Sequence, residues 1–449
     1  MSSTSKILIS CCAASSALFS GYALADDDET LLLMSDLNYA GAFRITYVSQ
    51  DEGKLGFAQG RIAVSSDTNS FFIAGNPNEA IAEYSIPEIV NSTDLDELNF
   101  TGEPLQNFVD FSEKASYTTD NNNIRNVAGM EVMDGKLIVT VYDAYDAASS
   151  LGFDVDNLFI VEDAYDLANS KVTGYIEMED NMFAAGWLSP IPTNLQSELG
   201  ADYITGSARM ASIDGRWSMG PSAYSVDSDT LLSTSAGGTV PNTALLKYPL
   251  FNRMWWQMDG VNQWNYDDEE DNANCPSFVD DNDLWSADCV QDNDLWTELS
   301  RAHYGVIVPG TKTYLTLGSS AGHQTGSAYK NSPVGYGTAC SGGCPYDWTD
   351  QDNRIWMFDV DDLIAHKNGE SESYDAVPYE YGTIDYPFDD TDGDGTISKV
   401  IGADYDSASN LLYIVLDKAD EEQAYEAAPL VLVYEIELNR PKPPVIMSE

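Results

Sequence analysis

Three carboxylates at alternate positions near the C-terminus form the pattern in this chain that is most typical of a metal site. The run Asp390-Thr-Asp-Gly-Asp-Gly395 spaces its acids two residues apart. Gly395 permits the sharp turn that wraps such a loop around one hard cation. The pattern predicts bound calcium. The expected ligands are Asp390, Asp392, Asp394, Thr396 through its backbone carbonyl, and Ser398.

This loop is similar to the first part of an EF-hand loop, but it departs from that family at the last ligand. The EF-hand has a bidentate acid at the twelfth position, where this chain has Ile401, and the residues that follow alternate like a strand. A final ligand would come from elsewhere, with Asp389, Asp404 and Asp406 nearest in the sequence. We therefore interpret the loop as a structural calcium site rather than a sensor. The alternative is a solvated turn of Asp and Gly.

Candidate ligand-binding residues lie in a long insertion at 251–300 and at the starts of predicted strands. Eight of the nine tryptophans lie between Trp217 and Trp356. Aromatic rings beside Asp and Asn are typical of sugar-binding sites, because a ring face stacks on the apolar face of a sugar; a small core inside an insertion is the alternative. The candidates are Trp255, Trp256, Trp264, Arg209, Arg216 and His303, with Arg301 beside the last.

Groups for nucleophilic catalysis are scarce. The chain has three histidines and neither a GxSxG nor an HExxH motif. A glycosidase needs only two carboxylates at a defined separation, and 73 acidic residues could supply them. A hydrolase that acts on a polysaccharide or a phosphoester is therefore an alternative to a binding protein.

The N-terminus and the cysteines predict an exported protein. Residues 1–25 have one lysine, an apolar middle and a small-residue end at Ala23-Leu-Ala25, which is typical of a signal peptide; a lipoprotein box ending at Cys11 is the alternative. Four cysteines remain, which predicts two disulfides, with a zinc site as the alternative. We expect Cys275–Cys289 and Cys340–Cys344 because each closes a local loop.

The charge is strongly acidic, with a formal net charge of −52. Such a surface repels nucleic acid, and it fits either a collector of cations or a protein kept soluble in a salty medium. No later apolar run approaches the roughly 18 residues of a membrane span.

A phrase of two strands joined by a polar turn recurs along the chain. Its copies are Arg61–Gly75, Ala128–Asp143, Gly220–Ser233, Tyr304–Gly318 and Gly402–Asp417. A third strand follows each copy: Ala80–Val90, Asn157–Leu167, Ala244–Leu250, Arg354–Ile364 and Pro429–Leu438. This arrangement resembles the blades of the β-propeller superfamily, in which small sheets pack around a central channel.

The resemblance implies an all-β fold with five blades, with six or seven blades, or a β-sandwich with insertions, as alternatives. The leftover strand Asn38–Thr46 is expected to complete the C-terminal blade and close the ring. We expect a signal peptide at 1–25, one propeller domain at 26–438 with insertions at 251–300 and 320–353, and a tail at 439–449. The predicted function is the binding of a carbohydrate or another extracellular ligand; a structural protein of the cell surface is a further alternative.

Overall fold

The computed structural model describes residues 30–438, with gaps. The gaps are 78, 113, 116–124, 144–155, 181–182, 208–219, 249–294, 296, 298, 326, 330–331, 341–342, 373–374 and 390–395. The described part is mostly β, and none of its helices is long and apolar enough to cross a membrane.

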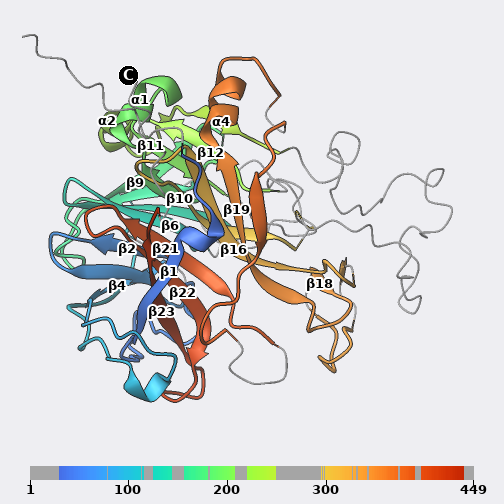
Figure 1. Cartoon of the computed structure of the whole chain (residues 1–449). Coiled ribbons are helices and arrows are strands. Elements are labelled where there is room, and N and C mark those ends of the chain that lie inside the picture. The colour runs from blue at the N-terminus through green and yellow to red at the C-terminus, as the bar shows by residue number, and fades with distance from the viewer. Residues whose placement is uncertain are drawn as a thin grey trace, which may run out of the picture.

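Four-stranded antiparallel sheets, the blades, form the body of the protein (Figure 1). Blade 1 contains β2 (Ile62–Ser65), β3 (Ser70–Ala74), β4 (Ala80–Ser85) and β5 (Gln106–Asp110). Blade 2 contains β6 (Arg125–Met133), β7 (Lys136–Asp143), β8 (Leu158–Val161) and β9 (Val172–Met178), with β13 (Thr239–Val240) added parallel to β9. Blade 3 contains β10 (Trp187–Pro190), β11 (Tyr203–Gly206), β12 (Ala223–Val226) and β14 (Thr243–Leu246).

The last two blades carry longer strands. Blade 4 contains β15 (Arg301–Ile307), β16 (Thr313–Ala321), β19 (Gln351–Asp359) and β20 (Glu380–Thr383). Blade 5 contains β21 (Val400–Asp406), β22 (Leu411–Asp420), β23 (Ala428–Ile436) and β1 (Leu37–Arg44). The first strand of each blade contacts the first strands of the two neighbouring blades, in the order β2, β6, β10, β15, β21 and back to β2. The chain is therefore a five-bladed β-propeller, as the repeats predicted.

Strand β1 closes the ring. It pairs antiparallel with β23 in a register that joins Leu37 to Ile436 and Arg44 to Leu430, so the two ends of the chain build one sheet (Figure 1). The prediction that the early strand completes the C-terminal blade is confirmed.

The predicted third repeat is wrong. We expected a hairpin at Gly220–Ser233, but β12 there is the third strand of its blade, and helix α2 (Ser228–Ser233) follows it. The side chain of Asp227 accepts a hydrogen bond from the backbone N–H of Thr230, so the polar stretch read as a turn is a helix N-cap. The true first pair of this blade is β10 and β11, which helix α1 (Thr193–Leu199) separates in the sequence.

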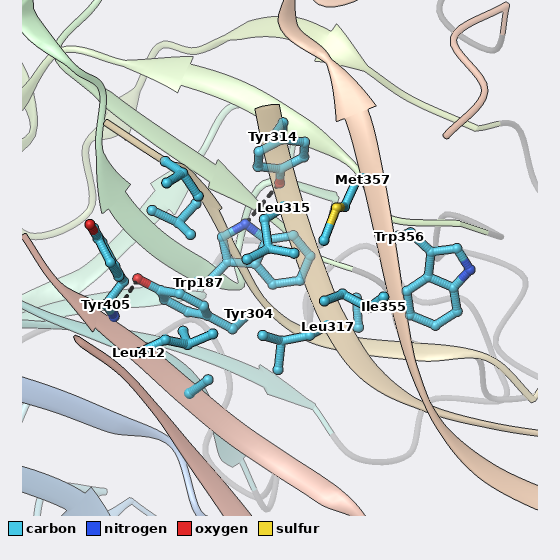
Figure 2. Close-up of a cluster of buried hydrophobic side chains, with 14 of the residues drawn as sticks. Trp187, Tyr304, Tyr314, Leu315, Leu317, Ile355, Trp356, Met357, Tyr405 and Leu412 are labelled. Carbon is cyan, nitrogen blue, oxygen red and sulfur yellow. Dashed lines mark hydrogen bonds between the residues drawn. The ribbon is translucent and has the colours of Figure 1, made fainter. Parts of the chain in front are cut away.

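Apolar side chains between neighbouring blades form the core. Figure 2 shows one such cluster, in which Trp187 lies near Tyr314 and Tyr304 lies near Tyr405. The indole Nε1–H of Trp187 donates to the hydroxyl of Tyr314 at 3.0 Å, a bond from blade 3 to blade 4. The buried rings thus supply both apolar area and a satisfied polar contact between blades.

The two faces of the ring differ. In a four-stranded antiparallel blade, the connection from the second strand to the third and the connection to the next blade leave from the face where the first strand begins. We call this the loop face, and the opposite face the turn face. The flanks of both predicted insertions, Leu246 with Arg301 and Ala321 with Gln351, end at the loop face. Helices α1, α2 and α4 (Val360–Lys367) belong to turn-face connections and lie together in Figure 1.

Candidate functional site

A small polar cavity lies at the loop face between blades 4 and 5. Its volume is about 90 Å³. Three groups of residues line it: the adjoining ends of β15, β16 and β19, strand β18 (Gly343–Pro345), and the residue before β21. Strand β18 pairs with β17 (Ser327–Tyr329). The lining residues that could contact a ligand are Arg301, Ser319, Ser320, Trp348, Gln351 and Lys399.

Two cations meet in this cavity. Arg301 begins β15, and Lys399 stands immediately before β21, so the packing of two adjacent inner strands brings them together. Burial and the neighbouring positive charge of Arg301 lower the pKa of Lys399 to about 8. Asp417 opposes this shift, but no described acid lies within ion-pair distance of the Lys399 ammonium.

An aromatic pair lies beside the cations. The ring of Tyr336 stacks on the ring of Trp348 with centroids 3.9 Å apart, and the Lys399 ammonium lies 5.9 Å from the centre of the Trp348 ring. Tyr336 is 44% exposed, so this pair presents an aromatic surface to solvent. The disulfide Cys340–Cys344 lies between these two aromatic residues in the sequence, and Cys344 also lines the cavity.

A chain of hydroxyl groups runs along one wall. The Thr297 backbone N–H donates to Ser300 Oγ at 2.8 Å, Ser300 Oγ lies 2.7 Å from Ser320 Oγ, and Ser320 Oγ lies 2.7 Å from His323 Nε2. Because Ser300 already accepts one hydrogen bond, its own proton can go to Ser320. The Ser320 proton can then go to His323. This arrangement gives one serine of the cavity a hydrogen-bonded base.

The centre of the ring holds a pair of carboxyl groups from different blades. Asp404 accepts hydrogen bonds from the Val64 backbone N–H at 2.6 Å and the Tyr304 hydroxyl at 3.0 Å, which ties blade 5 to blades 1 and 4. Burial raises the pKa of Asp404 to about 6. Burial and the charge of Asp404 hold the pKa of Glu131, on β6, well above its usual range.

This carboxyl pair serves the ring rather than a cleft. The hydrogen bonds to Asp404 come from protein groups on three strands, and neither Asp404 nor Glu131 lines either cavity described here.

A larger groove of about 560 Å³ lies along β5 at the outer edge of blade 1. Two of its polar side chains are already engaged: Gln50 Oε1 accepts from the Phe108 N–H, and Glu52 Oε2 accepts from the Asp110 N–H. These bonds cover the free edge of β5, which protects the strand from pairing with another chain. The groove therefore has a structural explanation.

The predicted metal site lies only partly within the described residues. Asp390, Asp392 and Asp394 are outside them, as are the predicted ligand-binding residues Trp255, Trp256, Trp264, Arg209 and Arg216 and the predicted disulfide partners Cys275 and Cys289. The part of the chain that is described contains no group of three or more His, Cys, Asp or Glu suited to a metal ion.

The two ends of the predicted calcium loop are close together. The Ser398 backbone N–H donates to the carbonyl of Asp389, so residues 390–395 span two points joined by a hydrogen bond. Ser398 is buried and Thr396 is half-buried. Asp404, one of the acids nearest in the sequence, is held at the centre of the ring instead. The calcium site remains a prediction.

His303 and the second predicted cysteine pair are described. His303 lies at an irregularity of the β15–β16 pairing, between Ala302 and Tyr304, and is half-buried, but it does not line the cavity. The Cys340–Cys344 disulfide is confirmed. The structure adds Trp348, Tyr336 and Lys399 as candidate site residues, and the aromatic content of the second insertion is the one sequence signal that points to any of them.

Comparisons with known proteins add little to the fold. No protein-family model and no curated protein matches the chain. Among solved structures, a luciferin-regenerating enzyme matches at 9% identity over 90% of this chain and 95% of that one, with a TM-score of 0.32. A Bacteroides fragilis protein described as exported matches at 8% identity over 91% and 98%, with a TM-score of 0.30. Similarity this low says nothing about what this chain binds or catalyses.

Proposed function

We propose that the protein is an exported, calcium-stabilised propeller that binds a saccharide at its loop face. The observation that carries this proposal is the stacked pair of Tyr336 and Trp348 beside a polar cavity. Export rests on the predicted signal peptide at residues 1–25, and calcium on the predicted loop at Asp390–Ser398.

The aromatic pair has the form that sugar recognition uses. A flat ring face accepts the apolar face of a pyranose, while polar groups at the ring edge hydrogen-bond to the hydroxyls. Ser319 and Gln351 line the cavity next to Trp348 and are suited to this second role. The Cys340–Cys344 disulfide restrains the backbone between the two rings, which lowers the ordering cost of binding.

A screen of the purified protein against a panel of neutral and acidic glycans, with and without calcium, tests the proposal. We expect binding that Trp348→Ala weakens at least tenfold. Tyr381→Ala is the matched control, because Tyr381 is an exposed aromatic residue on the outer strand β20 of the same blade. No binding to any glycan, or equal loss in both variants, would contradict a saccharide site at this cavity and favour a structural role.

The hydrogen bond between Ser320 and His323 favours a second candidate, a hydrolase at the same cavity. Ser320 would attack an ester carbonyl and pass its proton to His323 Nε2, which would give it to the departing alcohol as the ester C–O bond breaks. Water would then release the acyl group from Ser320. This candidate predicts slow ester hydrolysis that Ser320→Ala abolishes and Ser319→Ala retains, since Ser319 lines the same cavity and no hydrogen bond from it to a described histidine is present. Equal rates in all three proteins would exclude it.

A further inference from the structure

We infer that this cavity takes the acidic substituent of the saccharide, a carboxylate or a sulfate, between Arg301 and Lys399. The inference rests on the proposed function, because it specifies the chemistry of the same ligand. Both residues line the cavity, and their side chains come from adjacent blades.

The charge pattern of the chain sets this cavity apart. The sequence has 21 basic residues against 73 acidic ones, so a lysine in this protein has many acids available. Five other lysines of the described chain are paired with acids, in Lys54–Glu426, Lys136–Glu162, Lys247–Asp180, Lys312–Asp361 and Lys418–Asp417, whereas the unpaired Lys114 and Lys171 are exposed to solvent. Lys399 has no such partner among the described residues; it is buried, and Arg301 is a neighbouring cation.

Two neighbouring cations destabilise each other, and a bound anion relieves that repulsion. Arg301 can bind an oxyanion through two parallel N–H groups, while Lys399 supplies a compact charge. Ser319, Ser320 and Gln351 add hydrogen-bonding groups to the walls. The cavity thus has the charge and the polar groups for one oxyanion.

The size of the cavity determines which part of a ligand enters. A volume of about 90 Å³ is well below the roughly 300–1,000 Å³ of pockets that enclose a whole drug-sized ligand. This volume suits a carboxylate or a sulfate but is small for a whole sugar ring. The ring would remain outside, where Trp348 borders the cavity and the exposed Tyr336 extends the aromatic surface.

The acidic surface restricts the ligand further. A formal charge of −52 repels a long polyanion, whereas a short oligosaccharide with one or a few acids experiences less repulsion. Salt screens the long-range repulsion over about 8 Å at physiological ionic strength but screens a contact inside a cavity much less. We therefore expect the affinity for an acidic oligosaccharide to rise from low to moderate salt.

Calorimetric titration tests the inference with matched probes. The probes are short oligogalacturonides, their methyl esters, which keep the sugars but remove the charge, and a sulfated oligosaccharide of similar length. Wild type should bind the acidic forms at least tenfold more tightly than the ester, and Lys399→Met should erase this preference. Comparing the carboxylated and sulfated probes identifies the oxyanion. Lys312→Met is the control, because it removes a lysine of the turn face and should keep the preference.

Each outcome decides one question. If the wild type binds the acid and its methyl ester equally, the inference of an acidic substituent is wrong, while the proposed saccharide function stands. If no saccharide binds, but inorganic sulfate raises the Tm of the wild type and not that of Lys399→Met, the proposed saccharide function is wrong and the oxyanion site is supported. No response to any probe overturns both. Circular dichroism of each variant distinguishes a lost site from a lost fold.

Discussion

Arg44 on β1 and Asp420 at the end of β22 form a two-pronged ion pair. The Arg44 Nε–H donates to Asp420 Oδ2 at 2.8 Å and its Nη2–H donates to Oδ1 at 2.7 Å. Arg44 is 5% exposed and Asp420 is fully buried. The pair joins the N-terminal strand to the C-terminal blade at the place where the ring closes.

Removing one partner of this pair should loosen the closure. Asp420→Asn removes the buried carboxylate and leaves Arg44 only the exposed Glu422, whose Oε2 lies 2.9 Å from Nη2, so we expect a loss of about 1–3 kcal/mol of unfolding free energy. Urea denaturation should show this loss. Lys312→Ala is the control because it breaks an exposed pair with Asp361, for which a change below about 1 kcal/mol is expected. A similar loss in both variants would mean that β1 contributes little to closure.

The central carboxyl pair predicts an unusual pH dependence. Folding raises the pKa of Asp404 to about 6 and that of Glu131 well above its usual range, so the folded state binds more protons than the unfolded state. Their contribution to stability is therefore full below about pH 4 and is lost as the pH rises through about 6. The other titratable groups near the pair are Tyr304, Tyr203, Tyr413 and Asp406.

Glu131→Gln isolates this effect from that of the many surface acids. At pH 8 we expect the variant to be about 1–3 kcal/mol more stable than wild type, because the repulsion with Asp404 is gone. At pH 4 the two proteins should unfold alike. Thermal melts between pH 4 and 8 measure the difference, and Glu88→Gln on the surface is the charge-matched control. A constant difference across this range would show that the pair is not coupled.

Gly402 permits close contact between blades 5 and 1. A Cβ atom there would lie 2.1 Å from the carbonyl oxygen of Gly60, and the β21–β22 pairing is irregular at the same point. Gly402→Ala should therefore cost about 1–3 kcal/mol, the range for overpacking a core. Gly102→Ala has nothing within 4 Å of the new atom, so denaturation curves should show little change for that control.

The predicted calcium loop can be tested by removing the metal. If the loop binds calcium only in the folded state, free calcium at 100 times its Kd stabilises the fold by about 2.7 kcal/mol. A chelator should lower the Tm, added calcium should restore it, and magnesium should restore less because it accepts fewer geometries. Asp392→Ala should have the low Tm under all three conditions. If neither the chelator nor Asp392→Ala changes the Tm, the loop is a solvated turn rather than a calcium site.

The sequence reveals elements whose pattern is local. The hairpin of β21 and β22 alternates over a short polar turn, and the strand Asn38–Thr46 indicates ring closure because it has no hairpin of its own. Blade 3 was misread because its first strand has only four residues and ends in Pro190, and a helix separates it from its partner. Short strands with helical connections lack the period that sequence reasoning uses.

The cavity was beyond sequence reasoning for a different reason. Arg301 was noticed beside a strand, but Lys399 and Trp348 come from other connections, and only the packing of β15 against β21 joins them. Glu131 and Asp404 are likewise far apart in the sequence and meet at the axis of the ring. Such pairings depend on blade order and blade number, which weak repeats leave open.

The pairing of β1 with β23 also has a kinetic consequence. Leu37 and Ile436 must meet, so the final blade cannot assemble until almost the entire polypeptide has been synthesised and released. Contacts this distant in sequence are slow to form, and the partners of β1 stay uncovered meanwhile. We expect the last step of folding to be slow, and shortening either end to leave an open ring with exposed strand edges that pair with other chains.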